Sequence, residues 1–288
     1  MAADCRIGMT NLAWTVGDVT IKRVEERVTA LDSDILIPGI TPDLLAANAP
    51  WINPYFADNG KILLSIHSFV VTTKTLTIVV DTCVGVEPGR HLPGDGEFPE
   101  RLGASINGGL DGVDVVLCTH LHFDHVGWNT RLVGGQRVPT FANARYLVSS
   151  VEMAHFATEA ETDHGLAAVQ PLLDANLVDT VPNDYQITDE VRLVSTPGHS
   201  PGHVSVAINS QGNRALITGD ATHNPIQFAY PELAASGFDW DSEASTATRR
   251  SIVSQYAETG VLILGTHFAP PTGGYLRSDG HGKNWFDS

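Results

Sequence analysis

Residues 119–127 read THLHFDHVG and place three histidines and one aspartate within six positions, in a chain that has only 12 histidines. His120 and His122 are two residues apart, so in an extended segment their imidazoles point to one side of the chain. Asp124 and His125 then need a turn to face a second point. Because imidazole and carboxylate both suit Zn²⁺, this stretch predicts two ligands for each of two cations.

Apolar, strand-like runs recur along the chain. Residues 113–118 (VDVVLC) form a continuous apolar run, as expected for a strand covered on both faces. Further strands are expected at residues 19–28, 62–71, 76–81, 146–150, 191–195, 203–208, 215–220 and 261–266. Helices are expected at residues 151–160 and 242–258; Ser149 and Ser150 offer capping hydroxyls to the first, and Ile252, Val253 and Tyr256 share one stripe of the second. This alternation predicts an α/β architecture around a central sheet system.

Polar residues follow several of these strands directly. Asp81, His120, His199, Asp220 and His267 each come shortly after an apolar run. If the strands lie side by side, their carboxyl ends collect these side chains along one edge, where α/β folds place their chemistry. Zn²⁺ takes four ligands, often three from protein in catalytic sites. His199, Asp220 and His267 can therefore supply the metal ligands that residues 120–125 lack.

Composition limits the class of protein. The 288 residues can form one large domain, so we expect a single domain over residues 1–288, with residues 1–18 as a possible extended N-terminal segment. The net charge of −16 disfavours nucleic acid, and the lack of a long apolar run or an apolar N-terminal leader predicts no membrane span and no secretory signal. Three widely spaced cysteines, Cys5, Cys83 and Cys118, indicate a reducing, cytoplasmic compartment.

The order HxHxDH followed by an isolated His, Asp and His resembles the hallmark of the metallo-β-lactamase superfamily, from about Val19 to the C-terminal segment. The resemblance implies an αββα sandwich, with two central mixed sheets flanked by helices. It also implies two metal ions, Zn²⁺ by default, with Mn, Fe or Co as alternatives. The implied ligands are His120, His122 and His199 for the first ion, Asp124, His125 and His267 for the second, and Asp220 as a bridge.

The same resemblance implies roles beside the metals. Asp81 matches a strand-end aspartate that accepts a hydrogen bond from a metal-bound histidine and fixes its aim. Cys83 stands where the family usually has glycine, and His203 where it often has a histidine without a metal role; we expect both to be structural. His223, three residues after Asp220, lies where the N-acyl-homoserine lactonase branch has tyrosine. The segment GDATHNPIQF instead resembles the methyl parathion hydrolase branch, so His223 either contacts substrate or is purely structural.

Two such metals can share a water, lower its pKa toward 7 and polarise a substrate oxygen. The sequence thus predicts a dinuclear hydrolase that attacks an ester or lactone carbonyl of a neutral, partly apolar small molecule with a metal-bridging hydroxide. Asp124, Asp220 and His223 are the predicted catalytic residues. A phosphotriester hydrolase is one alternative, and a non-catalytic or redox protein on the same scaffold is another. The sequence leaves open whether the protein forms a homodimer.

Aromatic residues near the predicted edge are expected to wall an apolar substrate pocket, although each could equally cover the sheet. These residues are Trp51, Tyr55, Phe56, Phe228, Tyr230 and Phe268.

Overall fold

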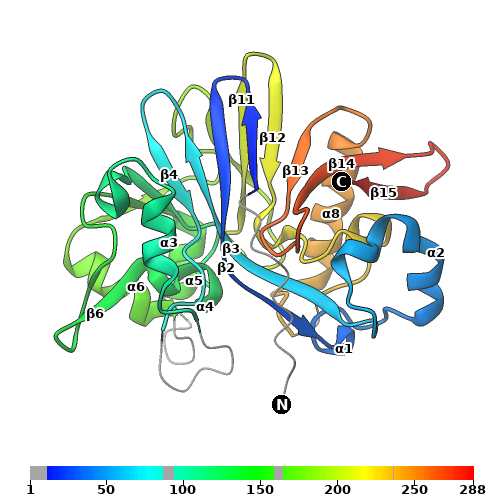
Figure 1. Ribbon diagram of the computed structural model, residues 1–288, viewed down its shortest axis with the longest axis horizontal. Helices are drawn as coiled ribbons and strands as arrows, with labels where there is room; N and C mark the ends of the chain where they lie inside the picture. The colour runs from blue at the N-terminus through cyan, green and yellow to red at the C-terminus, as the bar shows by residue number, and fades with distance from the viewer. Residues whose placement is uncertain (1–11, 87–93, 159–164, 236) are drawn as a thin grey trace.

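Two mixed β-sheets lie face to face in the middle of the molecule, and helices cover their outer faces (Figure 1). The computed structural model describes residues 12–86, 94–158, 165–235 and 237–288. In spatial order, the first sheet consists of β1 (Ala13–Val16), β2 (Val19–Leu31), β3 (Ile62–Thr72), β4 (Thr77–Val80), β5 (Val115–Leu117), β8 (Arg145–Ser149) and β9 (Val178–Val181).

The second sheet follows in the chain. In spatial order it consists of β10 (Val191–Ser195), β11 (Val204–Ser210), β12 (Asn213–Ile217), β13 (Leu262–Leu264), β14 (Gly273–Ser278) and β15 (Asn284–Asp287). Strands β4, β5, β8 and β9 run parallel to one another, as do β12 and β13. A separate hairpin joins β6 (Thr130–Val133) to β7 (Gln136–Pro139).

The longest of the described helices are α2, α6 and α8, with 11, 10 and 15 residues. The α-helices are α1 (Ser33–Leu36), α2 (Pro42–Ile52), α3 (Phe98–Ala104), α4 (Phe123–Val126), α5 (Ser150–Phe156), α6 (Gly165–Asp174), α7 (Ile226–Ala229) and α8 (Ser242–Tyr256). Four 3₁₀ turns accompany them: η1 (Asn53–Tyr55), η2 (Gly109–Gly112), η3 (Gly127–Asn129) and η4 (Gly219–Ala221). Within the described ranges, none of the helices is both long and apolar enough to cross a membrane.

Three apolar layers hold the sandwich together. Between the sheets, β4 and β5 pack against β10, β12 and β13 through fully buried residues such as Leu117 and Ile217. On the outer face of the first sheet, α3, α5 and α6 contribute Phe98, Phe156 and Leu172. On the outer face of the second sheet, α8 places Ile252 against β12 and β13. Complete burial of such a side chain is worth about 1.5–3 kcal/mol. The predicted αββα sandwich is confirmed.

All the predicted strands form, and both predicted helices do so within a few residues. Ser149 caps α5, because its hydroxyl accepts the Glu152 N–H. The strands with polar ends belong to both sheets of the sandwich. Within the possible extended N-terminal segment, residues 13–16 form β1, which pairs with β2. Residues 1–11 of the predicted extension, with Cys5, lie outside the described residues.

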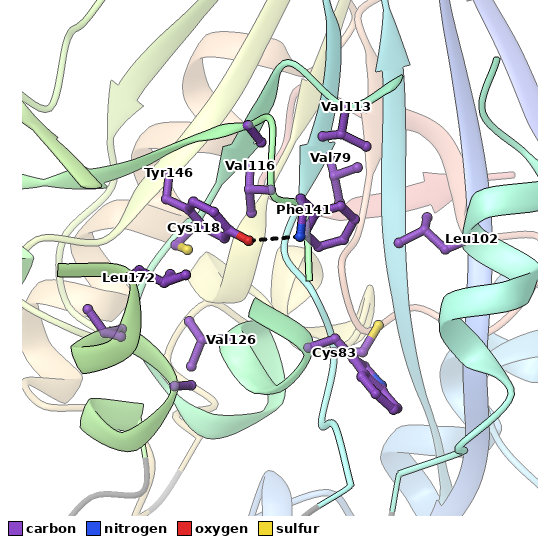
Figure 2. Packing of buried hydrophobic residues seen from close by; sticks show 14 of the residues in the cluster. Val79, Cys83, Leu102, Val113, Val116, Cys118, Val126, Phe141, Tyr146 and Leu172 are labelled. Atoms are coloured by element: carbon purple, nitrogen blue, oxygen red, sulfur yellow. Dashed lines mark hydrogen bonds between the residues drawn. The ribbon is translucent and has the colours of Figure 1, made fainter. Parts of the chain in front are cut away.

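The two described cysteines are buried in the layer outside the first sheet (Figure 2). Beside them the Phe141 N–H donates to the Tyr146 hydroxyl at 3.2 Å. Burial raises the pKa of the Cys118 thiol to about 12, so this thiol is unreactive in the folded chain. Cys83 has a φ of +58°, a conformation that glycine adopts freely and other residues rarely adopt. That backbone gives a physical reason for glycine to be usual at this position.

Candidate metal centre

The 119–127 stretch leaves β5 as an extended segment and then turns. His122 is extended, with φ −65° and ψ 153°, and the single turn of α4 follows it. The turn rests on the loop after β4, where Gly127 N–H donates to the Cys83 carbonyl at 2.7 Å. A β-carbon at Gly127 would lie 1.8 Å from the Val84 carbonyl oxygen, so only glycine permits this approach. The turn swings Asp124 and His125 away from the direction that His122 takes.

The second sheet supplies the other polar residues. His199 lies in the loop between β10 and β11, Asp220 lies in η4 directly after β12, and His267 follows β13. The ends of β4 and β5 meet these loops where the two sheets share an edge. The structure therefore gathers at one place the seven residues that the sequence proposes as metal ligands.

One oxygen, Oδ2 of Asp220, lies at the middle of this cluster. It is 3.2 Å from Nε2 of both His125 and His267, and 3.4 Å from Nε2 of His199. The potential ligand atoms form overlapping groups whose members all lie within 4.8 Å of one another. The groups are His120, His122 and His199; His120, His125 and Asp220; Asp124, His125 and His267; and His199, Asp220 and His223.

Hydrogen bonds at the far side of two rings fix which nitrogen faces inward. Nδ1 of His125 donates to Oδ2 of Asp81 at 2.8 Å, and Nδ1 of His267 donates to the Ser65 carbonyl at 2.8 Å. Their Nε2 atoms then face each other only 3.2 Å apart, and in the neutral rings each of these atoms carries a lone pair. Two inward lone pairs at that distance repel unless a cation or a proton lies beside them. This arrangement fits a metal ion.

Buried polar atoms without a hydrogen-bond partner also fit a metal ion at this place. Within the part of the chain that the structure describes, Nε2 of His120 and Oδ1 of Asp220 have no hydrogen-bond partner although both are buried. Buried polar atoms are rarely left so, and a missing ion is a common cause. Neutral imidazole with carboxylate is the donor set of Zn²⁺ and related transition-metal ions. The chemistry and arrangement of the residues thus fit a transition-metal centre.

Electrostatics divide the histidines into two kinds. Burial holds the pKa of His120 and of His199 well below the usual value. Both rings are therefore neutral and can bind a metal ion through a nitrogen lone pair. Burial also opposes protonation of His125, but the carboxylates of Asp220, Asp81 and Asp124 outweigh it and raise the pKa of His125. Without a cation, protons on such rings balance the buried carboxylates.

Asp81 lies where the sequence predicts it. Its carboxylate accepts the Thr119 N–H and the Thr119 hydroxyl, each at 2.8 Å, as well as the His125 ring. The carboxylate is 1% exposed, so these contacts are shielded from water. Asp81 ties the end of β4 to the end of β5 and aims His125 inward.

His203 is structural but close to the cluster. Its Nδ1 donates to the Thr196 carbonyl at 3.0 Å, and its Nε2 accepts the Asp220 backbone N–H at 2.8 Å. Burial lowers the pKa of His203 to about 4, so the ring keeps a free lone pair for that N–H. His203 therefore positions the backbone of Asp220.

Two buried carboxylates support the cluster without being predicted from the sequence. Glu152 in α5 accepts from Leu121 N–H at 3.1 Å, Ser200 hydroxyl at 2.7 Å and Gly202 N–H at 2.9 Å. Asp239 accepts from Nδ1 of His199 at 3.1 Å. Glu152 lies in a predicted helix and Asp239 in a loop between predicted elements, and neither carries a motif that marks it.

His223 lies against the cluster. Its Nε2 is 3.1 Å from Oδ2 of Asp220, and its ring stacks nearly parallel to His267 with centroids 5.6 Å apart. Gln227 fixes the segment by accepting the His223 backbone N–H at 2.7 Å. Nδ1 of His223 is buried and has no hydrogen-bond partner among the described residues. His223 of the GDxxH pattern and Gln227 of the QF pair are thus joined by a hydrogen bond within one turn.

The structure corrects the predicted aromatic pocket. Tyr55, Phe228 and Phe268 are at most 1% exposed and pack edge-on against one another or Phe286 in the core outside the second sheet. Fully packed rings cannot wall a pocket open to substrate.

The other three aromatic residues are half-buried, and each contacts a different part of the fold. Trp51 lines a cleft of about 740 Å³ between α2 and the β14–β15 hairpin, and none of the seven proposed ligands lines that cleft. Phe56 bridges to Ile62 at the start of β3. The Tyr230 hydroxyl accepts from Asn48 of α2 at 3.0 Å.

Access to the cluster is on the Asp124 side. The side chain of Asp124 is 18% exposed, whereas those of His125, His199, Asp220 and His267 are at most 3% exposed. His122 and Phe123 are also half-buried. The cluster is therefore nearest to solvent at α4.

Known proteins resemble this chain over much of its length. The N-acyl homoserine lactonase of Bacillus cereus is 29% identical over 135 residues, 46% of this chain and 48% of that protein. The chain thus spans about half the length of these curated relatives. The probable metallo-hydrolase YflN of Bacillus subtilis (strain 168) is 26% identical over 216 residues, 67% of this chain and 81% of that protein.

Solved structures share the fold. The hydrolase AbOPH, described as in the beta lactamase superfamily, superposes with a TM-score of 0.79 at 25% identity over 96% of both chains. AidC, described as a dizinc quorum-quenching lactonase, superposes with a TM-score of 0.77 at 19% identity over 96% of both chains. A family model described as Metallo-beta-lactamase superfamily matches residues 62–267, which include all seven proposed ligands. The chain belongs to the metallo-beta-lactamase superfamily.

Proposed function

We propose that the protein is a dinuclear metal-dependent hydrolase of a neutral, partly apolar ester or lactone. The observation that carries the proposal is the cluster around Asp220, whose Oδ2 lies 3.2 Å from Nε2 of both His125 and His267, while these two nitrogens lie 3.2 Å from each other. His120, His122 and His199 would hold one ion, and Asp124, His125 and His267 the other, with Asp220 between them. Zn²⁺ is the default ion, and Mn²⁺, Fe²⁺ or Co²⁺ fit similar donors.

Two bound divalent cations supply a strongly activated water at neutral pH and a Lewis acid for the substrate oxygen. Within this chain, Asp124 would accept the proton of the attacking water, because its carboxylate is the most accessible of those at the centre. Asp220, which lies between the two sets of ligand residues, would hold these sets at a fixed spacing. His223 would donate to the substrate carbonyl or leaving oxygen, because its Nδ1 has no protein partner.

Relatives favour a lactone. AidC is described in complex with N-hexanoyl-homoserine as a product, and several curated relatives are named N-acyl homoserine lactonases. The net charge of −16 also disfavours anionic substrates. Both points support a small neutral carbonyl substrate.

A phosphotriester is the second candidate. The GDATHNPIQF segment, whose resemblance to the methyl parathion hydrolase branch suggests this candidate, forms a local turn in which Gln227 accepts the His223 backbone N–H at 2.7 Å.

The test combines metal analysis with a substrate panel. Purified chain should contain about two transition-metal ions and lose turnover when a strong chelator removes them. An N-acyl-homoserine lactone, an aryl ester and a diaryl-alkyl phosphotriester are then compared by kcat/KM. Turnover of the phosphotriester alone would replace the first candidate by the second. Full activity in metal-free protein would overturn the proposal.

A further inference from the structure

The histidines of the two metal-binding groups are supported in different ways. In the Asp124 group, His125 donates to the carboxylate of Asp81, whereas His267 donates to a backbone carbonyl. In the His122 group, Nδ1 of His120 lies 3.1 Å from the Thr119 hydroxyl, and Nδ1 of His122 lies 2.8 Å from Nε2 of His199. His199 itself donates from Nδ1 to the carboxylate of Asp239 at 3.1 Å. Each group therefore has one histidine with a carboxylate behind it.

Asp239 is built into the protein interior. Its side chain is 0% exposed. One oxygen accepts from His199, and the other accepts the Ala235 N–H at 3.1 Å. The guanidinium of Arg249, also 0% exposed, lies 3.6 Å from the second oxygen. An ionised carboxylate can only accept, so both neighbouring N–H groups point at it.

Backbone contacts hold the same segment against the His199 loop. Trp240 N–H donates to the His199 carbonyl at 3.0 Å, and Asp241 N–H donates to the Gly198 carbonyl at 2.9 Å. Arg249 in turn donates from Nε to the Pro231 carbonyl at 2.8 Å. The loop before α8, the start of α8 and the His199 loop thus form one connected unit with Asp239 at its centre.

We propose that Asp239, held by Arg249, is a positioning residue that keeps His199 with its proton on Nδ1 and its Nε2 lone pair aimed at the metal nearest His122. The inference rests on the proposed dinuclear centre. A carboxylate behind a ligand imidazole fixes the ring and raises its basicity, and its loss typically weakens metal affinity by about 10–100-fold. Asp239→Asn is the sharpest change, because the amide keeps the shape but offers one acceptor for two N–H donors.

Asp241→Ala provides a matched control. Asp241 lies in the same segment and caps α8 through the Glu243 and Ala244 N–H groups at 2.9 and 3.0 Å. Its loss should reduce stability by about 0.5–2 kcal/mol without touching His199. A general loosening of the segment would affect metal binding in both variants, whereas loss of the His199 contact would affect it only in Asp239→Asn.

The experiment titrates the metal-free parent, Asp239→Asn and Asp241→Ala with Zn²⁺ against a chromophoric chelator. We expect one of the parent's two ions to bind about 10–100-fold more weakly in Asp239→Asn, with both unchanged in Asp241→Ala. Equal affinities in Asp239→Asn and parent would overturn the inference, as would an equal loss in both variants. A parent that binds two ions yet hydrolyses nothing would refute the proposed function alone. A parent that binds no ion would refute both.

A second measurement does not depend on the folding of a variant. Nitrogen-15 NMR of the imidazoles in the zinc-loaded parent should show His199 with its proton on Nδ1. A His199 ring protonated on Nε2 instead would overturn the inference whatever the variants do.

Discussion

Glu152 offers a strict test of how the two ligand loops are held together. Its carboxylate is buried, and its three hydrogen bonds reach Leu121 in the first ligand loop and Ser200 and Gly202 in the second. The side chain thus crosses between the stretch that holds His120 and His122 and the loop that holds His199. Removing it should loosen both loops at once.

The magnitude follows from the three donors. A hydrogen bond to a charged acceptor is worth about 1.5–3 kcal/mol, but bonds that share one acceptor do not add fully. Glu152→Ala leaves three buried donors unpaired, so the free energy of unfolding should fall by about 3–5 kcal/mol. Glu152→Gln can still accept on one side but turns an amide N–H₂ toward the remaining donors. It should lose about 1–3 kcal/mol, the cost of one unmade buried hydrogen bond.

The assay is urea unfolding of metal-free protein, so that bound metal does not add to stability. Glu100→Gln is the control, because Glu100 is exposed in α3, and it should change stability by less than about 0.5 kcal/mol. If Glu152→Ala and Glu152→Gln both matched the control, the carboxylate would not be bridging the loops and the reasoning would fail.

Three further predictions concern the centre and one concerns the core. His122→Ala should lower metal content and abolish turnover; an active variant would exclude His122 as a ligand. Asp81→Ala should weaken metal affinity by about 10–100-fold, and full retention measured by chelator competition would remove its positioning role. His223→Ala should keep its metal content but lose about 10²–10⁴-fold in kcat; an unchanged rate would make His223 purely structural. The pKa of Cys118 is raised to about 12 by burial, against about 8.5 in an unfolded chain. Its contribution to stability is therefore complete below pH 8.5 and is lost as pH rises above it. In urea unfolding at pH 7 to 10, Cys118→Ala should show a shallower decline than the parent, and equal slopes would contradict the assigned pKa.

The sequence predicts strands and turns correctly where the local pattern of residues is enough to determine them. The apolar runs at 191–195 and 203–208 become β10 and most of β11 because their inward side chains fill the layer between the sheets. The HxHxDH spacing places His122 on extended chain and His125 on a turn, as the alternation of side chains along the chain requires.

The misses share a different physical cause. The sequence leaves open whether the aromatic residues near the predicted edge wall a pocket or cover the sheet. Phe228 and Phe268 pack in the core, because the side of a sheet that a loop residue meets depends on the tertiary path. Ser65 supports His267 with a backbone carbonyl, which every residue possesses and no sequence pattern marks. Asp239 comes 40 residues after His199, and nothing in the spacing announces the contact.

The division of ligands between the sheets has a consequence for stability. His120 and His122 follow a strand of the first sheet, but their partner His199 follows a strand of the second. Asp124 and His125 likewise pair with His267 across the same boundary. Each ion would therefore join the two sheets at their shared edge, and binding to the folded chain alone stabilises it by about 2.7 kcal/mol per ion at a free concentration 100 times Kd. The apolar layer between the sheets has no such dependence, because residues such as Leu117 and Ile217 pack there without polar partners. Metal removal should thus loosen the edge that carries the chemistry while the layer beneath it keeps the sandwich folded.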